Sequence, residues 1–158
     1  MSDPFWYIKA NRKNGRKVQF MGAKKLAVIL RGIPGSGKST KARQIAEKHD
    51  GTVICSADDY FVGEDGVYRF DVNKIGQAHG ACKRKFADAL KARESVVIVD
   101  NTNTRHREYK DYVREAKNYG YEVKVIKIPL IDAELAAERN THGVPLETIK
   151  KMIARFED

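Results

Sequence analysis

The stretch Gly-Ile-Pro-Gly-Ser-Gly-Lys-Ser, at positions 32–39, decides the fold. It consists of a glycine, four free positions and then Gly-Lys-Ser, which is the pattern of a phosphate-binding P-loop. Glycines are needed because such a loop follows a tight, partly left-handed path on which backbone N–H groups point at phosphate oxygens. An apolar run at 26–30 precedes the motif and a helical pattern at 40–49 follows it. We therefore expect a buried strand, then the loop, then a helix whose N-terminus favours an anion.

Particular residues of the loop have expected roles. Lys38 should reach the β- and γ-phosphates of a nucleotide, and the Ser39 hydroxyl should ligate Mg²⁺. The loop residues expected to contact the nucleotide are Gly35, Ser36, Gly37, Lys38, Ser39 and Thr40. The sequence thus predicts ATP and Mg²⁺ as cofactors, and the alternative is a glycine-rich turn that binds nothing.

Strand-like and helix-like segments alternate along the rest of the chain. Short apolar segments predict strands at 26–30, 52–56, 95–100 and 122–128. Helical spacing and capping residues predict helices at 40–49, 73–91, 103–119, 132–139 and from Pro145 onward. We expect Asn103 or Thr104 to cap the third of these helices, Asp132 to cap the fourth, and Pro145 to occupy the first turn of the last. Strands separated by helices imply an α/β fold with a parallel sheet and right-handed crossovers.

Size, composition and charge limit the possible functions. The 158 residues suit one compact domain, and the longest apolar runs are far shorter than the ~20 residues that span a bilayer. The two cysteines match no zinc motif, so we expect a reduced, intracellular protein in the cytoplasm or nucleus, with no membrane association. Thirty Lys and Arg against 21 acids give a net charge of +9. That charge favours a nucleic-acid partner, with plain solubility as the alternative.

Residues 1–24 stand outside the alternating pattern and are predicted to be an extension to a domain at 25–158. Aromatic segments at 5–8 and 18–20 flank a basic turn that contains Asn14-Gly15, which predicts a hairpin. Its aromatics either pack on the core, which we favour, or stack on nucleotides.

Acidic residues follow two of the predicted strands, where ligands of parallel sheets bind. Asp58 and Asp59 follow the strand at 52–56, and one of them is placed to accept a proton from an attacking hydroxyl. Asp100 ends the strand at 95–100 and resembles a Walker B residue that helps to hold Mg²⁺, while Asn101 and Thr102 could bond phosphate or acceptor. The alternative in both places is that the side chain caps a helix.

A third candidate group is Arg139 with the break that follows it. A helix that ends in arginine, followed by a glycine-containing turn and another helix, looks like a lid over the nucleotide, at about 132–150. Arg139 would then stabilise charge on the transferring phosphoryl group. The alternatives are a solvent-exposed arginine that complements the helix dipole, and a His142 that merely hydrogen-bonds within its loop.

These motifs occur together, in matching order, in one family. The segments at 32–40, 56–60, 100–103 and 138–145 resemble the kinase domain of phage-type polynucleotide 5′-hydroxyl kinases. They are similar also to the ATP-binding, kinase-like domain of eukaryotic ubiquitin-ligase-binding proteins and to that of the myelin cyclic nucleotide phosphodiesterase. The resemblance implies a three-layer, kinase-type P-loop sandwich with four to five parallel strands and a helical lid. It also implies Asp58 as general base, Lys38 and Ser39 at phosphate and Mg²⁺, Arg139 in the lid, and 5′-hydroxyl RNA or DNA as substrate.

The chain departs from the phage pattern at the acceptor side. Phe61 stands where the phage enzymes have an arginine for the acceptor phosphate, and the lid lacks a second arginine before Gly143. Acceptor binding is therefore expected to use other cations, with Arg69, Arg105 and Arg107 as candidates. The chain lacks a paired His-x-Thr/Ser motif, so cyclic phosphodiesterase activity is not expected. The alternative functions are a small-molecule kinase and a non-catalytic, ATP-gated nucleic-acid-binding module.

Overall fold

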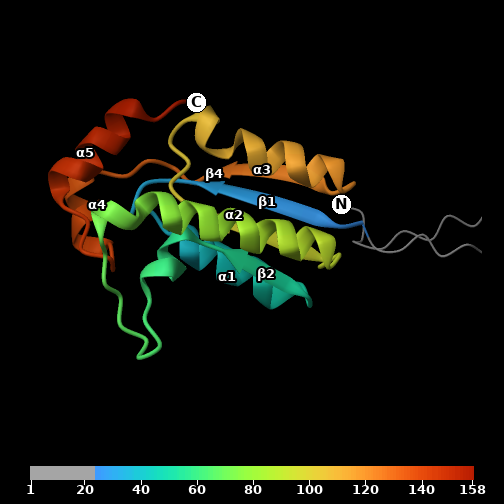
Figure 1. Ribbon diagram of the computed structural model, residues 1–158. Helices are drawn as coiled ribbons and strands as arrows, with labels where there is room; N and C mark the ends of the chain where they lie inside the picture. The colour runs from blue at the N-terminus through green and yellow to red at the C-terminus, as the bar shows by residue number, and fades with distance from the viewer. Residues whose placement is uncertain (1–23) are drawn as a thin grey trace, which may run out of the picture.

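The fold is built on a parallel sheet of four strands, as predicted (Figure 1). The computed structural model describes residues 24–158, so the hairpin predicted N-terminal to the domain lies outside the described residues. The strands are β1 (Leu26–Arg31), β2 (Thr52–Cys55), β3 (Val96–Asp100) and β4 (Glu122–Lys127). Their order in the sheet is β2-β3-β1-β4, with every pairing parallel. β1 therefore lies in the middle of the sheet, which explains why its sequence is almost wholly apolar.

Helices cover both faces of this sheet, and the result is a three-layer sandwich (Figure 1). α1 (Lys38–Lys48) packs on one face, whereas α2 (Ile75–Lys91) and α3 (His106–Asn118) pack on the other. In β1, Leu26, Val28 and Leu30 face α1, and the alternating Ala27 and Ile29 face α2 and α3. Because β1 is buried on both faces, the side chains that point to either face of the sheet must be apolar.

A third hydrophobic cluster joins two further helices to the loop that follows β1. α4 (Ala133–Arg139) and α5 (Leu146–Arg155) lie beyond the carboxyl ends of the strands (Figure 1). Ile33 of the P-loop packs with Ala133 and Ala136 of α4 and with Ile149 of α5, and none of the four is more than 9% exposed. The phosphate-binding loop and the predicted lid therefore share one small core.

Arg31, at the end of β1, is a buried cation that the sequence patterns did not reveal. It is 3% exposed, and its guanidinium lies 4.8 Å from the Tyr109 ring and 5.0 Å from the Phe156 ring. It donates to the carbonyl oxygen of Asn103 at 2.9 Å and to that of Glu157 at 2.6 Å. These bonds fasten the residues after α5 to the ends of β1 and β3.

Several predicted helix boundaries need correction. α3 begins at His106 with Arg105 as its N-cap, not Asn103 or Thr104. Asn103 is otherwise engaged, because it adopts a left-handed φ of 46° and its side-chain amide donates to the carbonyl oxygen of Leu30 at 2.8 Å.

The other boundaries differ less from the prediction. Pro145 is the N-cap of α5 rather than a residue of its first turn. The segment predicted as one helix at 73–91 starts with a 3₁₀ turn, η2 (Val72–Lys74), before α2. The predicted cap at Asp132 is confirmed, since its carboxylate accepts from the N–H groups of Glu134 and Leu135.

Two smaller predictions concern cysteines and membranes. Cys55 and Cys82 are both free thiols in the interior, and burial raises the pKa of Cys55 to about 12. Among residues 24–158, no helix has the length and apolar character that crossing a bilayer requires.

Candidate active site

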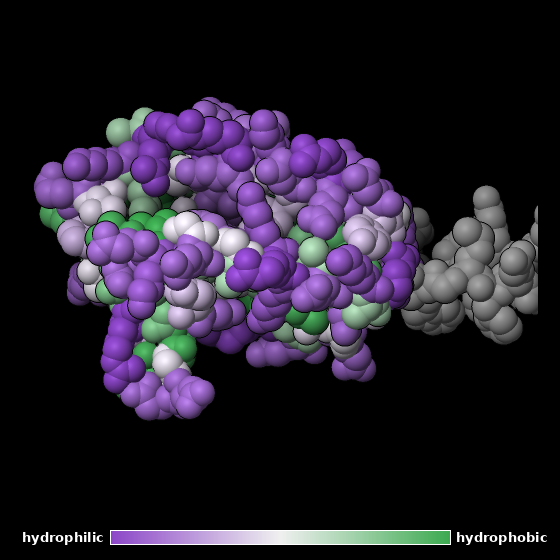
Figure 2. All heavy atoms as spheres, viewed as in Figure 1, coloured by the Kyte–Doolittle hydropathy of each residue, from purple (hydrophilic) through white to green (hydrophobic). Residues whose placement is uncertain are grey.

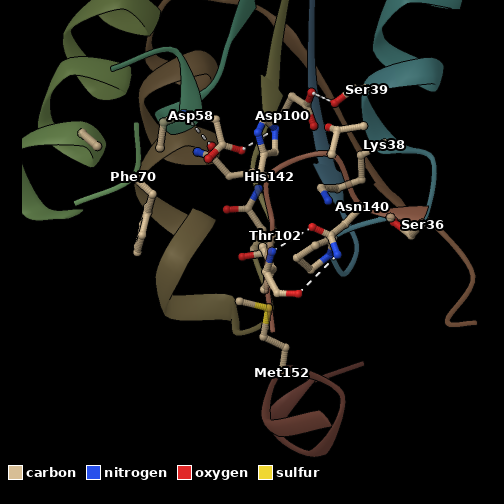
Figure 3. Close-up of a pocket in the computed structure, with 18 of the residues that line it drawn as sticks. Ser36, Lys38, Ser39, Asp58, Phe70, Asp100, Thr102, Asn140, His142 and Met152 are labelled. Carbon is tan, nitrogen blue, oxygen red and sulfur yellow. Dashed lines mark hydrogen bonds and ion pairs between the residues drawn. The ribbon is translucent and has the colours of Figure 1, made fainter. Parts of the chain in front are cut away.

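A cavity of about 1180 Å³ opens at the carboxyl ends of the strands (Figure 3). The P-loop, η1 (Ala57–Phe61), the end of β3 and the turn between α4 and α5 all line it, and residues of α2, α3 and α5 complete its walls. The structure thus brings together all the segments that the sequence predicted to converge. The volume exceeds the roughly 300–1,000 Å³ of a typical single-ligand pocket, so donor and acceptor can share the cavity.

The P-loop has the backbone that phosphate binding requires. Gly35 and Gly37 have φ angles of 77° and 99°, a region that L-residues with side chains rarely adopt. A Cβ atom on Gly37 would meet no heavy atom within 4 Å, so open space lies beside the N-terminus of α1. The Ser36 hydroxyl is buried yet has no hydrogen-bond partner among the described residues. A buried polar atom beside an open helix N-terminus suits a bound phosphate.

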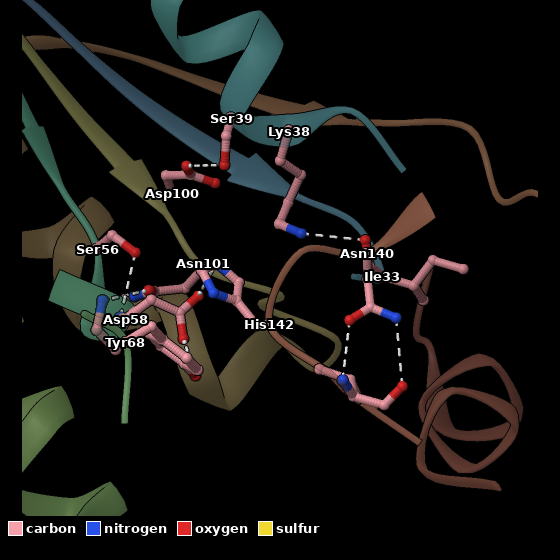
Figure 4. A network of polar contacts seen from close by, with 12 residues as sticks. Ile33, Lys38, Ser39, Ser56, Asp58, Tyr68, Asp100, Asn101, Asn140 and His142 are labelled. Atoms are coloured by element: carbon pink, nitrogen blue, oxygen red, sulfur yellow. Dashed lines mark hydrogen bonds and ion pairs between the residues drawn. The ribbon is translucent and has the colours of Figure 1, made fainter. Parts of the chain in front are cut away.

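Lys38, Ser39 and Asp100 form the polar floor of the cavity (Figure 4). The Ser39 hydroxyl donates to Oδ2 of Asp100 at 2.8 Å, and Nζ of Lys38 donates to the carbonyl oxygen of Ile33 at 3.1 Å. Burial lowers the pKa of Lys38, while the carboxylates of Asp100 and Asp58 oppose that shift. Burial likewise raises the pKa of Asp100, opposed by the Ser39 hydrogen bond and the Lys38 charge. A hydroxyl paired with a carboxylate is the oxygen donor set that Mg²⁺ prefers, so these residues fit the predicted metal.

Of the two adjacent aspartates, only Asp58 lines this cavity. Its Oδ1 accepts from the Tyr68 hydroxyl at 3.2 Å, and its Oδ2 lies 3.5 Å from Nε2 of His142. Asp59 instead lies 3.5 Å from Nζ of Lys85 on α2. Asp59 also lines a smaller pocket that shares Ser39, Asp58 and Asp100, so what distinguishes Asp58 is its place in the large cavity.

Asn101 holds the segment that carries Asp58. Its side-chain oxygen accepts from the N–H of Ala57 at 2.9 Å, and its amide nitrogen donates to Sγ of Cys82 at 3.5 Å. The Ser56 hydroxyl caps η1 by accepting from the N–H of Asp58, so neither aspartate serves as the cap. Asn101 also lines the cavity, so its predicted contact with phosphate or acceptor stays a prediction beside this structural role.

Tyr68 and His142 are contacts of Asp58 that sequence analysis missed. Their rings lie 4.4 Å apart between centroids, so the turn after α4 rests on the segment after η1. Burial, together with the charge and hydrogen bond of Asp58, raises the pKa of Tyr68 to about 12, so its hydroxyl remains a donor. No motif marks Tyr68, and His142 was noted only as a loop residue.

Arg139 lies at the end of α4 and lines the cavity that Asp58 also lines. The following turn is shaped by Asn140, whose side-chain oxygen accepts from the N–H of Val144 at 2.8 Å and whose amide donates to the carbonyl oxygen of Ala137 at 2.8 Å. The turn that follows Arg139 and carries His142 is therefore internally braced (Figure 4).

The three arginines proposed for the acceptor side lie in different places. Arg107 lines the cavity, whereas Arg69 and Arg105 do not. Arg69 makes two hydrogen bonds to the carboxylate of Asp65, at 3.0 and 2.7 Å, on the outside of the loop after η1. The remaining wall on this side carries Phe70, Ile75, His79 and Lys83.

We expect Gly35→Ala to weaken nucleotide binding, whereas the same replacement at a glycine away from the P-loop should not. A Cβ on Gly35 would lie 2.3 Å from the carbonyl oxygen of Ala136 in α4, so the loop or the helix must move. Gly66 is the matched control, because its φ of 76° is nearly the same and its Cβ would meet nothing within 4 Å. Both variants should lose about 1–2 kcal/mol of unfolding free energy to left-handed strain. Only Gly35→Ala should also lower nucleotide affinity in calorimetric titration, and equal affinities would contradict this contact.

Comparison with known proteins agrees with this geometry. Residues 28–158 match the AAA_33 family model, described as an AAA domain. The chain belongs to this family. It is 36% identical over 146 residues to NEDD4-binding protein 2 of Homo sapiens, covering 90% of this chain but 8% of that protein. It is 31% identical over 135 residues to 2′,3′-cyclic-nucleotide 3′-phosphodiesterase of Rattus norvegicus, covering 81% of this chain and 30% of that protein.

Solved structures share the fold of this AAA_33 domain. A chain in the structure of the Pnkp1/Rnl/Hen1 complex is 27% identical with a TM-score of 0.59, over 73% of this chain and 39% of its own length. Kti12 of Chaetomium thermophilum in complex with ADP-AlF3 is 18% identical with a TM-score of 0.58, over 84% and 80% of the two chains, and shows the fold alone. The chain is thus a P-loop kinase-like domain, and it spans well under half of the curated relatives described here.

Proposed function

We propose that this domain transfers the γ-phosphoryl group of ATP to the 5′-hydroxyl of a polynucleotide. The observation that carries the proposal is the shared cavity in which Asp58 faces the P-loop floor of Lys38, Ser39 and Asp100. A protein that only bound nucleotide would need the floor but no carboxylate held across from it, as Tyr68 and His142 hold Asp58. The resemblance to polynucleotide kinases supports the choice of acceptor.

The residues divide the chemistry between them. The loop amides and Lys38 hold the donor phosphates, and Ser39 with Asp100 would hold Mg²⁺, which supplies charge neutralisation for the transferring group. Asp58 accepts the proton of the attacking hydroxyl as the new P–O bond forms and the bond to the β-phosphate oxygen breaks. Arg139, from the α4–α5 lid, stabilises the charge on the phosphoryl oxygens. Excluding water beneath the lid protects the reaction from hydrolysis.

The acceptor wall favours a nucleic-acid end over a small metabolite. It combines the exposed ring of Phe70 with the cations Lys83 and Arg107. Aromatic faces stack on bases and cations bind the backbone phosphates of single strands. A metabolite kinase needs only a local polar pocket, whereas this wall continues out of the cavity to exposed surface.

The direct test is transfer of labelled γ-phosphate from ATP, with Mg²⁺, to RNA and DNA oligonucleotides. We expect label on strands with a 5′-hydroxyl and none on the same strands already phosphorylated at the 5′ end. Comparing RNA with DNA in that experiment identifies the preferred nucleic acid. If ATP binds but neither strand is labelled, the polynucleotide acceptor is wrong and a screen of small hydroxyl compounds follows.

A further inference from the structure

The exposed surface of α3 separates its charges into two rows. Three of its residues, Tyr109, Tyr112 and Ala116, are buried against the sheet. The acidic residues recur at positions 108, 111 and 115, and the basic residues recur at positions 107, 110, 114 and 117. Spacings of three and four place each set in its own row along the helix. We call Arg107, Lys110, Arg114 and Lys117 the α3 basic row, and all four are exposed.

Two of the three acidic residues bond to neighbouring parts of the protein, whereas the basic row is largely free. Glu108 accepts from the Thr104 hydroxyl and from the N–H of Arg105, and Asp111 lies 3.7 Å from Nζ of Lys83 on α2. Within residues 24–158, the only ion pair of the basic row joins Arg114 to Asp111 at 2.8 Å. Arg107, Lys110 and Lys117 therefore present positive charge to solvent without an ion-pair partner among the described residues.

Helix stability does not account for the position of Arg107. Arg107 is in the first turn of α3, where the positive end of the helix dipole disfavours a cation. Arg107 also lines the active-site cavity, so the basic row begins inside the site. From position 107 to 117 the row runs about 15 Å along the helix axis. α3 leads away from the cavity end of the sheet, and hydrophilic side chains cover it (Figure 1 and Figure 2).

We propose that the α3 basic row binds the backbone phosphates of the acceptor strand as that strand leaves the active site. The inference rests on the proposed function, because it needs the 5′ end to occupy the cavity beside Asp58. One row of cations along one helix matches a single phosphodiester backbone. Contacts to phosphate carry no base information, so the binding is independent of sequence.

The test uses two lysine pairs that differ only in location. Lys110→Ala/Lys117→Ala removes half of the row, and Lys48→Ala/Lys124→Ala removes the same charge from α1 and β4. All four lysines are exposed and none has an ion pair within the described residues, so both variants should fold. A single-stranded 12-mer with a 5′-hydroxyl and a 3′ fluorophore is titrated by anisotropy at several salt concentrations.

The expected result is a change in salt dependence. Each phosphate contact to a single strand contributes about −0.7 to the slope of log K against log[salt]. Removing Lys110 and Lys117 should therefore reduce the magnitude of that slope by about 1.4, and the control pair should leave it unchanged. Equal slopes in both variants and the wild type would overturn the inference, and so would an equal reduction in the control pair.

Kinetics with the same variants separate this inference from the proposed function. For the 12-mer, we expect KM to rise roughly tenfold or more in Lys110→Ala/Lys117→Ala with kcat unchanged, and for a dinucleotide acceptor we expect no change. If wild type labels no strand but binds the 12-mer through the row, the proposed function fails, and the row is a binding site for single strands that are not acceptors. If wild type labels the 12-mer and Lys110→Ala/Lys117→Ala has the same KM and the same salt slope, the inference about the basic row is wrong and the proposed function is retained.

Discussion

Asp58→Asn is expected to lower kcat for phosphoryl transfer by about 10²- to 10⁴-fold while nucleotide affinity stays close to that of the wild type. The substitution keeps the size and shape of the side chain but removes its ability to accept a proton. Asp58 makes no hydrogen bond to the P-loop, and its segment is held through Ala57 and Asn101. Single-turnover transfer of labelled phosphate measures the rate, and calorimetry measures nucleotide binding.

The adjacent aspartate provides a matched control for this prediction. Asp59 carries the same charge and follows directly in η1, but it pairs with Lys85 and does not line the large cavity. Asp59→Asn should therefore retain turnover within a few-fold of wild type. Equal losses in the two variants would mean that the negative charge of the segment matters rather than a base at Asp58. Wild-type turnover in Asp58→Asn would rule out its assignment as general base.

The strands and helices were predictable because their apolar spacing is a local property. Burial of β1 on both faces shows directly as an unbroken apolar run, and the carboxyl-end rule for parallel sheets then places Asp58 and Asp100 together. The errors lie where a side chain makes a long-range bond. Asn103 resembles a helix cap in sequence, yet its side-chain amide donates to the carbonyl oxygen of Leu30 in the neighbouring strand.

The parts of the site that were missed depend on tertiary contacts without a sequence signature. Outside the cavity, Arg31 ends the apolar strand β1 and is buried because Tyr109 and Phe156 come from distant segments to cover it. Tyr68 and His142 are 74 positions apart, and only the path of the turn after α4 stacks them beside Asp58. The sequence did not distinguish between the candidate acceptor arginines, Arg69, Arg105 and Arg107. Only Arg107 lines the cavity, because it lies in the first turn of α3.

Lys38→Ala is expected to reduce both nucleotide affinity and turnover, which distinguishes it from the substitution of the base. Its ammonium group lies at the cavity floor, near the carboxylates of Asp100 and Asp58. A hydrogen bond from a charged group contributes roughly 1.5–3 kcal/mol, so the nucleotide Kd should rise about 10- to 150-fold. Charge also develops on the transferring group, so kcat should fall by a further 10²- to 10³-fold.

Lys41 supplies the control, because it lies three residues later in α1, is exposed and does not line the cavity. Lys41→Ala makes the same chemical change without altering the floor, and its Kd and kcat should match the wild type. In Lys38→Ala the buried Asp100 also loses a neighbouring positive charge that lowers its pKa. Removing Lys38 therefore acts on the phosphates directly and on the Ser39–Asp100 pair beside them. Unchanged turnover in Lys38→Ala would contradict a catalytic P-loop, whatever the acceptor proves to be.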